Sequence, residues 1–283
     1  NFTSSVEFQP RAQIFINPTC MVKFYGAVTT PEFTSPKDMW KITSSKELYS
    51  TSPVTMDFDS YYSAVNFYGE QVNIHSGFIS YGNDALNSIN VSSSEIDYMV
   101  FRDCETALTI SQGNQGNVDI RYLVIYKCDN SGIVYTSNID GGDTSGYITK
   151  SIVIDIIQRA VSVGMAKNLY INNCYFQDNY YAIVNRGCNG NIECNEFSNN
   201  YYDINYIGRY PSLHNEIHYN IFFKSNYYSI YITGRINNIT NNNFYGPTQF
   251  YIYILNNISP FTIVSADVNA TNNYWAVEEV DQY

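Results

Sequence analysis

Apolar residues recur along most of this chain in a six-residue phrase that predicts a repeating, strand-rich structure. The phrase begins with isoleucine and ends with an aromatic or aliphatic residue, as in Ile171-Asn-Asn-Cys-Tyr-Phe176 and Ile192-Glu-Cys-Asn-Glu-Phe197. A period of 21 to 28 residues is typical of a solenoid, in which each copy forms one turn. The copies that define these intervals start at Ile96, Ile120, Ile148, Ile171, Ile192, Ile217 and Ile239, and a last, incomplete copy ends at Trp275.

A second phrase follows most copies of the first. It places one small or polar residue before an aliphatic residue, and in three copies a tyrosine pair precedes them, as in Asn179-Tyr-Tyr-Ala-Ile183 and Asn200-Tyr-Tyr-Asp-Ile204. The apolar residues alternate with a period of two, as in strands, and the 3.6-residue period of helices is absent. We therefore expect two or three short strands per turn, joined by tight bends, with equivalent positions stacked about 4.8 Å apart.

These repeats resemble the right-handed parallel β-helix of the pectin-lyase-like superfold. The resemblance implies an all-β fold, a right-handed parallel β-helix solenoid over residues 61–275 with an N-terminal capping segment. It implies little about function, because proteins of this architecture include lyases, hydrolases, adhesins and viral spikes. The signatures of its pectin hydrolases (Asp-Asp, His-Gly and Arg-x-Lys on the coils) are not found here, which weakens the enzyme interpretation.

The two ends of the chain lack a clear repeat. Residues 1–60 contain two expected strands and, after Ser35, a short helix that begins at Pro36, with Asp38 in its first turn. Since the end of a solenoid exposes unpaired strand edges, we interpret 1–60 as a cap and as a candidate assembly region. Residues 276–283 form a short acidic tail that could cover the other end only in part, which leaves room for end-to-end contact between subunits.

Asparagine recurs at two positions of the repeat, and we expect both sets to form ladders that stabilise the bends. Stacked amide side chains can hydrogen-bond along the axis and satisfy backbone groups of the turns. The first set is Asn195, Asn220, Asn242 and Asn273, with Cys174 in the preceding turn, and the second is Asn179, Asn200 and Asn226.

The tyrosine pairs are the most distinctive candidate surface. Strand alternation places one member of each pair inward and the other outward, unless a bend intervenes. The outward rings are either a packing ladder or a platform for sugar rings, formed by Tyr180, Tyr201 and Tyr227. Four further tyrosines would extend such a platform: Tyr206, Tyr210, Tyr251 and Tyr253.

Cys104 and Cys128 occupy one column in successive turns. In an oxidising compartment they could form a disulfide, and two stacked buried thiols are the alternative. A further pair could form within the group Cys174, Cys188 and Cys194, with Cys20 left over, and the three histidines (His75, His214 and His218) have no metal-site spacing.

The carboxylates do not follow a known catalytic pattern. Glu105 lies above Asp129, a like-charge pair that either stays solvated or binds Ca²⁺, and Asp103 lies above Lys127. Arg121 lies beside Asp97, which predicts a salt-bridge ladder. We assign no catalytic residue, no metal ligand and no cofactor, with Ca²⁺ as the one alternative.

Composition and charge narrow the partners. The net charge is −11 and the pI is about 4.6, which argues against nucleic acid, and no apolar run is long enough to span a membrane. The chain begins Asn-Phe-Thr, which is typical of a processed N-terminus, and it contains five N-x-Ser/Thr acceptor sites. These sites favour an extracellular glycoprotein and are Asn1, Asn90, Asn238, Asn257 and Asn269.

Three functions fit these observations. The first is an extracellular structural or adhesive surface protein, such as a subunit of a filament, surface layer or virion appendage, whose partners are copies of itself or surface glycans. Its low charge and its richness in Asn, Ser, Thr and Tyr resemble the composition of secreted proteins of archaea and their viruses. The second function is a carbohydrate-active lyase or hydrolase, and the third is a glycan-binding module that uses the tyrosines.

Overall fold

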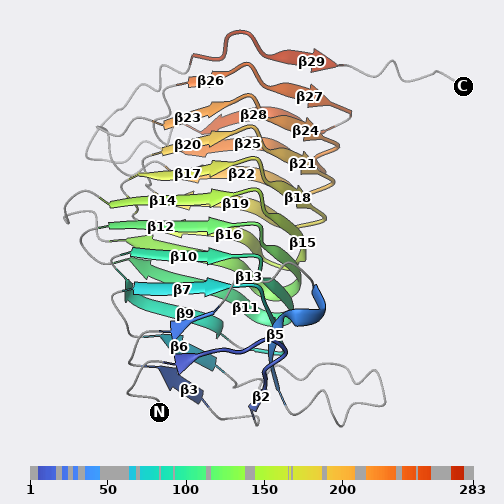
Figure 1. Cartoon of the computed structure of the whole chain (residues 1–283). Coiled ribbons are helices and arrows are strands. Elements are labelled where there is room, and N and C mark those ends of the chain that lie inside the picture. Colours follow the sequence, from blue (N-terminus) through green and yellow to red (C-terminus); the bar gives the residue numbers. More distant parts are fainter. Residues whose placement is uncertain are drawn as a thin grey trace, which may run out of the picture.

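The chain is an all-β parallel solenoid, with strands stacked along one axis (Figure 1). The structure is a computed structural model, and it describes residues 6–16, 21–24, 28–30, 36–44, 64–67, 71–82, 84–91, 93–112, 116–137, 144–164, 166, 168–186, 190–207, 215–233, 238–246, 248–255 and 269–276. Within these residues the only helical element is a short 3-10 turn, η1 (Pro36–Asp38), where the sequence predicts a short helix. None of the helical structure described is long and apolar enough to cross a membrane.

Each complete turn contributes a strand to each of three stacks, and every strand pairs in parallel with its equivalents in the neighbouring turns. The first stack is one ten-stranded sheet made of β1 (Val6–Glu7), β4 (Val28–Thr29), β7 (Gln71–His75), β10 (Ser93–Asp97), β12 (Gly116–Arg121), β14 (Thr144–Thr149), β17 (Leu169–Asn172), β20 (Gly190–Glu193), β23 (Asn215–His218) and β26 (Asn238–Thr240).

The second and third stacks meet at a corner that two long strands, β11 (Val100–Gln112) and β13 (Val124–Ser137), pass through without a break. The second stack also contains β2 (Gln13–Ile16), β5 (Trp40–Ser44), β8 (Gly77–Ser80), β15 (Ile152–Ile156), β18 (Tyr175–Gln177), β21 (Glu196–Ser198), β24 (Ile221–Phe223), β27 (Asn243–Tyr245) and β29 (Tyr274–Ala276). The third contains β3 (Met21–Phe24), β6 (Ala64–Phe67), β9 (Asp84–Val91), β16 (Arg159–Gly164), β19 (Tyr181–Arg186), β22 (Tyr202–Ile207), β25 (Tyr228–Thr233) and β28 (Phe250–Leu255).

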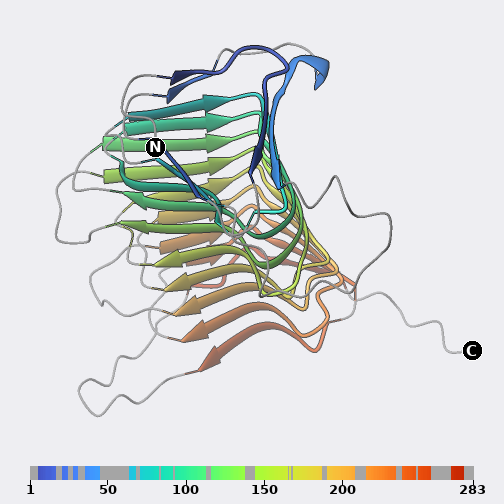
Figure 2. The same ribbon diagram turned by 90° about the horizontal axis from the view of Figure 1, so that it is seen from below.

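The predicted solenoid is confirmed, with about seven turns from β10 to β28. The view from below shows the stacked turns, with the N-terminal strands at one end (Figure 2). The described strands of residues 1–60 belong to the same stacks, because β1 pairs with β4, β2 with β5 and β3 with β6, all in parallel. The division into a cap at 1–60, a solenoid at 61–275 and a tail at 276–283 stays a prediction.

Apolar columns fill the interior, and the six-residue phrase supplies two of them. The isoleucine that starts each phrase is in register with its equivalents from Ile74 to Ile239, and these side chains are buried. The aromatic residue that ends the phrase lies in the second stack, where Phe197 and Phe222 stack with ring centroids 4.9 Å apart. The column continues through Phe244 to Trp275, whose ring lies 4.4 Å from that of Phe244. The phrase therefore spans one bend and both of its adjoining strands.

From β7 to β27, two bends in each turn use left-handed backbone, and all of these positions except Gly246 carry residues other than glycine. In the first bend, equivalent residues from Ser76 to Asn272 have φ between 50° and 59°. In the second, those from Tyr81 to Lys224 have φ between 51° and 58°. This conformation costs roughly 1–2 kcal/mol for a residue with a Cβ atom. It is held in place because backbone hydrogen bonds between turns continue through the bend, as from Lys150 N to Asn172 O at 3.2 Å.

The first asparagine ladder is confirmed and has a clear cause. From Cys174 to Asn242, the residue after each first bend points inward, and its backbone N–H donates to the asparagine side chain of the next turn. Asn220 Oδ1 accepts hydrogen bonds from Asn195 N at 3.0 Å and Asn195 Nδ2 at 3.1 Å. Asn220 Nδ2 donates to Ile192 O at 2.8 Å. Each amide therefore supplies the acceptor that the neighbouring bend lacks.

The second asparagine ladder is shorter than predicted. Asn200 Oδ1 accepts from Asn179 N and Asn179 Nδ2, at 3.0 Å and 2.9 Å. The predicted third member, Asn226, is instead exposed, because the next turn carries one extra residue at this bend. Ser225, which is buried, stands three residues after Phe222, as Asn200 stands three residues after Phe197.

The ladder predicts a large and local stability effect. Asn220→Ala leaves Asn195 N and Asn195 Nδ2 buried without their acceptor, so we expect the free energy of unfolding to fall by about 3 kcal/mol. Urea unfolding measures this change. The matched control is Asn226→Ala, which removes an exposed amide and should change the free energy by about 0.5 kcal/mol or less. Equal effects of the two substitutions would contradict the ladder's stabilising role.

Candidate functional site

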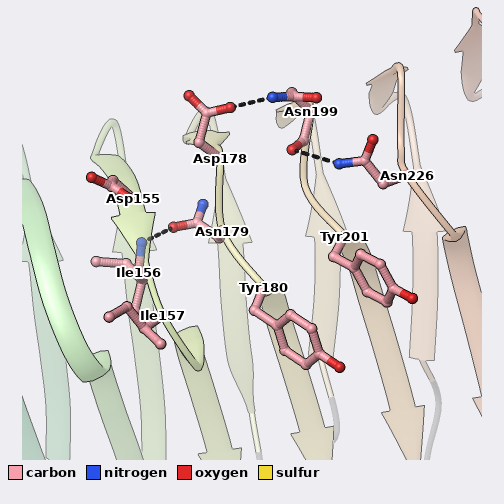
Figure 3. A pocket seen from close by; sticks show the side chains of 9 residues that line it. All are labelled: Asp155, Ile156, Ile157, Asp178, Asn179, Tyr180, Asn199, Tyr201 and Asn226. Atoms are coloured by element: carbon pink, nitrogen blue, oxygen red, sulfur yellow. Dashed lines mark hydrogen bonds between the residues drawn. The ribbon is translucent and has the colours of Figure 1, made fainter.

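A groove runs along the solenoid axis beside the second bend, and we take it as the candidate site (Figure 3). It has a volume of about 310 Å³. Two rows of side chains from successive turns line it. The polar row is Asp155, Asp178, Asn199 and Asn226, the apolar row is Ile157, Tyr180 and Tyr201, and Ile156 and Asn179 complete the lining.

Hydrogen bonds between turns fix the polar row. Asn199 Nδ2 donates to Asp178 Oδ1, and Asn226 Nδ2 donates to Asn199 O at 3.3 Å. Asp155, Asp178 and Asn199 have φ of 58°, 54° and 54°, so these three members of the row belong to the second line of left-handed bends, whereas Asn226 follows the bend residue Lys224 by two positions. Below it, Asn179 Oδ1 accepts from Ile156 N at 3.1 Å. Hydrogen bonds between turns thus hold this wall of the groove in place, and the wall presents oxygen and amide groups.

Both members of each tyrosine pair lie on the surface, so the exception predicted for a bend applies and the expected alternation of one inward and one outward ring does not. Tyr180 is 44% exposed, and its neighbour Tyr181 is half-buried on the same surface. The reason is the corner between the second and third stacks. Two successive residues, Ala182 and Ile183, both point into the core there, so the strand alternation fails at this point.

The tyrosines form two parallel columns of stacked rings. In the outer column, Tyr201 stacks on Tyr180 at 5.0 Å and on Tyr227 at 5.6 Å, with interplanar angles of 9° and 6°. In the inner column, Tyr202 stacks on Tyr181 at 4.5 Å and on Tyr228 at 5.6 Å. The columns meet edge to face, as between Tyr201 and Tyr202 at 77°.

This geometry changes what a sugar platform at Tyr180, Tyr201 and Tyr227 would offer. The ring faces cover one another along the axis, so a face of Tyr201 is not open to a sugar. The columns instead present ring edges toward solvent, beside the polar row of the groove. The platform stays a prediction, and its chemistry would be hydrogen bonding and edge contact in the groove, not stacking on open ring faces.

The other tyrosines that were expected on the surface differ in their burial. Tyr206 is 2% exposed and belongs to the core, so its prediction as a surface ring is wrong. It follows Ile204 by two residues and shares that inward direction. Tyr251 is partly buried against the core, whereas Tyr253 stacks on Tyr231 at 5.6 Å next to the tyrosine columns. Tyr210 lies outside the described residues.

The groove continues into a second hollow with more carboxylates. This hollow has a volume of about 180 Å³ and is lined by Asp103, Lys127, Asp129, Asp155 and Ile157. Burial, together with the nearby charges of Glu105 and Asp103, raises the pKa of Asp129 to about 6. The described residues contain no group of three His, Cys, Asp or Glu side chains placed to hold a metal ion. A Ca²⁺ ion at Glu105 and Asp129 therefore gains no support from a third ligand.

A buried carboxyl group lies directly under the tyrosines. Asp203 follows Tyr202, is fully buried, and contacts Ser225 Oγ and Asn200 Nδ2, the latter at 2.9 Å. Its burial raises its pKa from 3.8 to about 8, although both hydrogen bonds favour the charged form. Ala182 holds the equivalent position one turn earlier, so the acid replaces a small apolar residue.

Cys104 and Cys128 are in register on adjacent strands, and both are buried free thiols. A hydrogen bond with Cys104, together with burial, raises the pKa of the Cys128 thiol. The thiol form was one of the two alternatives, and a disulfide between these residues stays a prediction. Cys174 is also buried, and burial raises its pKa to about 12, whereas Cys194 is exposed. Cys20 and Cys188 lie outside the described residues.

The outward face of the first sheet carries an ionic cluster larger than the sequence indicated. The predicted Arg121–Asp97 contact is present at 3.2 Å, and Arg121 also pairs with Asp119 at 3.2 Å and with Glu95. Asp97, though buried, additionally contacts His75 Nδ1. The missed signal was spacing: His75, Asp97 and Arg121 occupy one column in three successive turns.

A second histidine joins the same column further along the sheet. His218 Nε2 lies 2.5 Å from Glu193 Oε2, and His218 Nδ1 lies 3.4 Å from Glu216 Oε2. Glu216 also accepts a hydrogen bond from Asn238 Nδ2 at 3.0 Å. The sequence alone assigned neither Glu193 nor Glu216 to any site. The third histidine of the chain, His214, lies outside the described residues.

The predicted glycosylation sites fall in different surroundings. Asn269 is exposed, and its Nδ2 donates to Asn238 Oδ1 at 3.2 Å, so two of the five acceptor residues touch each other. Asn90 lies in β9. Asn1 and Asn257 lie outside the described residues. All five remain predictions.

Comparison with known proteins adds no relative. No protein family matches the chain, and no curated protein or solved structure matches it. The interpretation of the groove therefore depends on its own geometry and chemistry.

Asp203 predicts an unusual dependence of stability on pH. The carboxyl is protonated in the folded chain up to about pH 8 and ionised in the unfolded chain above about pH 3.8. The unfolded state thus binds fewer protons in this window, and stability should fall by about 1.4 kcal/mol per pH unit as the pH rises through it. Asp203→Asn should remove this contribution and stabilise the protein at pH 8. Urea unfolding at several pH values, compared between the two chains, provides the measurement. The same slope in both would contradict the buried, protonated state.

Proposed function

We propose that this protein is an extracellular structural or adhesive surface protein that binds glycans in the groove beside the second bend. The observation that carries the proposal is the groove itself, with one wall of carboxylates and amides and one wall of tyrosine edges and isoleucine. Sugars present hydroxyl groups and apolar C–H patches on the same ring, so both walls have a partner.

The charge of the chain favours neutral glycans. The net charge is −11, and the groove and its extension contain Asp103, Asp129, Asp155 and Asp178 against Lys127. A polyanionic polysaccharide would be repelled from this surface. Because each of four successive turns places a polar side chain on this wall, an extended chain could meet a polar group at every turn. This repetition supports a binding role over a single reaction centre.

We propose that the solenoid is right-handed and of the pectin-lyase-like kind. Parallel strands joined by a crossover in one sheet are right-handed in about 98% of cases, which supports the handedness. The parallel stacks, the asparagine ladder and the aromatic column support the superfold, since they are the features on which the resemblance depends.

Self-association is the other partner we propose. The last described strand of the second stack, β29, pairs with β27, and its Trp275 is 42% exposed on one side of the aromatic column. In our proposal, this end forms the contact between neighbouring subunits of a filament or layer. Electron microscopy of the native material tests this assembly directly. We expect filaments or layers, and isolated monomers alone would contradict the proposal.

Two matched glycine substitutions test the groove. Asn199→Gly keeps the left-handed bend and removes one side-chain amide from the groove, and Asn241→Gly removes an amide at a left-handed bend outside the groove, where φ is 57°. We expect Asn199→Gly to weaken binding to immobilised neutral polysaccharides such as cellulose, chitin or mannan about tenfold, ~1.4 kcal/mol. Asn241→Gly should bind as the parent does. Equal binding by both variants would place the site elsewhere, and no binding to any glycan at millimolar concentration would end the adhesive proposal.

A carbohydrate-active enzyme is the second candidate, and the ionic cluster on the first sheet is the observation that favours it. Glu95 and Asp119 both contact Arg121, and burial together with the neighbouring carboxylates raises the pKa of Asp119 against the opposing effect of Arg121. Carboxyl groups with shifted pKa values serve as acids and bases in polysaccharide cleavage.

The enzyme candidate predicts that the protein shortens at least one of the same polysaccharides and that Asp119→Asn abolishes this activity. Asp119 is partly exposed, so the substitution should leave the fold intact. Release of reducing ends or of unsaturated products is the readout. Unchanged polysaccharide length after prolonged incubation with the parent protein would eliminate this candidate.

A further inference from the structure

The tyrosine columns hold six phenol rings at distances that favour radical chemistry. Neighbouring rings in the same column are 4.5 to 5.6 Å apart between centroids, and most are within 10° of parallel. The rings of the two columns are also in contact, as between Tyr227 and Tyr228 at 4.3 Å. The column members are Tyr180, Tyr201 and Tyr227 on the outer side, and Tyr181, Tyr202 and Tyr228 on the inner side.

The rings are both accessible and fixed in register. Tyr180 and Tyr201 are 44% and 38% exposed, so an oxidant in solution can reach them. Their backbones are held by hydrogen bonds between turns, from Tyr201 N to Asn179 O at 2.9 Å and from Tyr202 N to Tyr180 O at 2.8 Å. Neighbouring rings therefore stay opposite each other, and coupling requires the side chains to rotate until two ortho carbons meet.

We propose that these columns are a site of oxidative modification, at which a one-electron oxidant joins tyrosines of adjacent turns as dityrosine. The oxidant class is a haem peroxidase acting with hydrogen peroxide. Each of two phenols loses one electron and one proton, and the two radicals couple through ring carbons ortho to the hydroxyl. The coupled product regains aromaticity as the two ortho hydrogens move to the phenol oxygens. The sum is two tyrosines plus one hydrogen peroxide giving one dityrosine plus two waters.

The stack also explains why coupling would occur within a column. A radical formed on an exposed outer ring can pass to a neighbour in van der Waals contact, so two oxidation events anywhere in the columns can meet on adjacent rings. Burial and the neighbouring tyrosines raise the pKa of Tyr202 to about 12, so this phenol keeps its proton until it is oxidised. Oxidation then removes the proton together with the electron.

Such bonds would add covalent links between side chains of neighbouring turns, which otherwise contact one another only non-covalently. A link from Tyr180 to Tyr201 or from Tyr181 to Tyr202 closes a loop of one turn of chain. Consecutive links would cross-link the turns that contain β19, β22 and β25 in series. This outcome goes beyond glycan binding and would stand even if the groove bound no sugar.

The full chain, treated with horseradish peroxidase and hydrogen peroxide at low protein concentration, tests the proposal. We expect dityrosine fluorescence in the monomer and, after proteolysis, cross-linked peptides that have lost two hydrogen atoms. These peptides should join Tyr180 to Tyr201, Tyr181 to Tyr202, Tyr201 to Tyr227, or Tyr202 to Tyr228. The same treatment in concentrated urea should lose these specific pairs, because the register exists only in the folded chain.

A matched pair of variants completes the test. The double variant Tyr201→Phe/Tyr202→Phe keeps the stacked rings but removes both central phenols, so every cross-linked peptide between turns of the columns should disappear. Tyr219→Phe removes a phenol that is 58% exposed and lies outside the columns, and it should leave those peptides unchanged. Cross-links found only between separate molecules, or an undiminished yield in the double variant, would overturn the proposal.

Discussion

Parallel pairing in register is the constraint on which the rest of this structure depends. Each residue of a turn lies directly beside its equivalents in the turns before and after, so any side chain placed at a position must tolerate contact with its own kind. Isoleucine, phenylalanine, asparagine and tyrosine all meet this condition, through close packing, ring stacking or a donor and an acceptor on the same amide. Charged residues meet it less well, and the chain uses few of them. Where they occur in one column, as at Asp97 and Arg121, residues of opposite charge lie next to each other.

The same constraint distributes stability unevenly. A ladder residue in the middle of the stack serves two neighbours, whereas a residue at an end serves one. For example, Asn220 Oδ1 accepts a hydrogen bond from Asn195 Nδ2, and Asn220 Nδ2 donates one to Asn242 Oδ1. Its removal therefore leaves a deficit on the adjacent turn, beyond the loss of its own contacts. The buried Asp203 lowers stability as the pH rises. It places a carboxyl group, which burial keeps uncharged, in a column otherwise occupied by small residues.

The sequence was sufficient for the repeat, the columns and the asparagine ladder, because all three follow from the period alone. It was insufficient where a bend changes the direction of a side chain. Both tyrosines of a pair lie outside because Ala182 and Ile183 turn inward together, and no count of alternating residues reveals that corner. Asn226 does not belong to the ladder because its turn has one extra residue at the bend, which puts Ser225 at the ladder position. The strands of the N-terminal region were missed as part of the stack, since their register with later turns carries no shared phrase. The ionic cluster was underestimated because its members are far apart in sequence and become neighbours only through the register.

The left-handed bends have a consequence for how such a protein can vary. Each bend position keeps its backbone conformation whether it carries tyrosine, lysine, cysteine, asparagine or aspartate, as Tyr122, Lys150 and Cys194 illustrate in one line and Asp155 and Asn199 in the other. Backbone bonds between turns, and not the side chain, hold the angle. Two lines of residues along the length of the molecule are thus free to change identity without disturbing the interior. Descendants of one such scaffold could carry different surface chemistry along these lines, turn by turn, while the packed interior stayed the same.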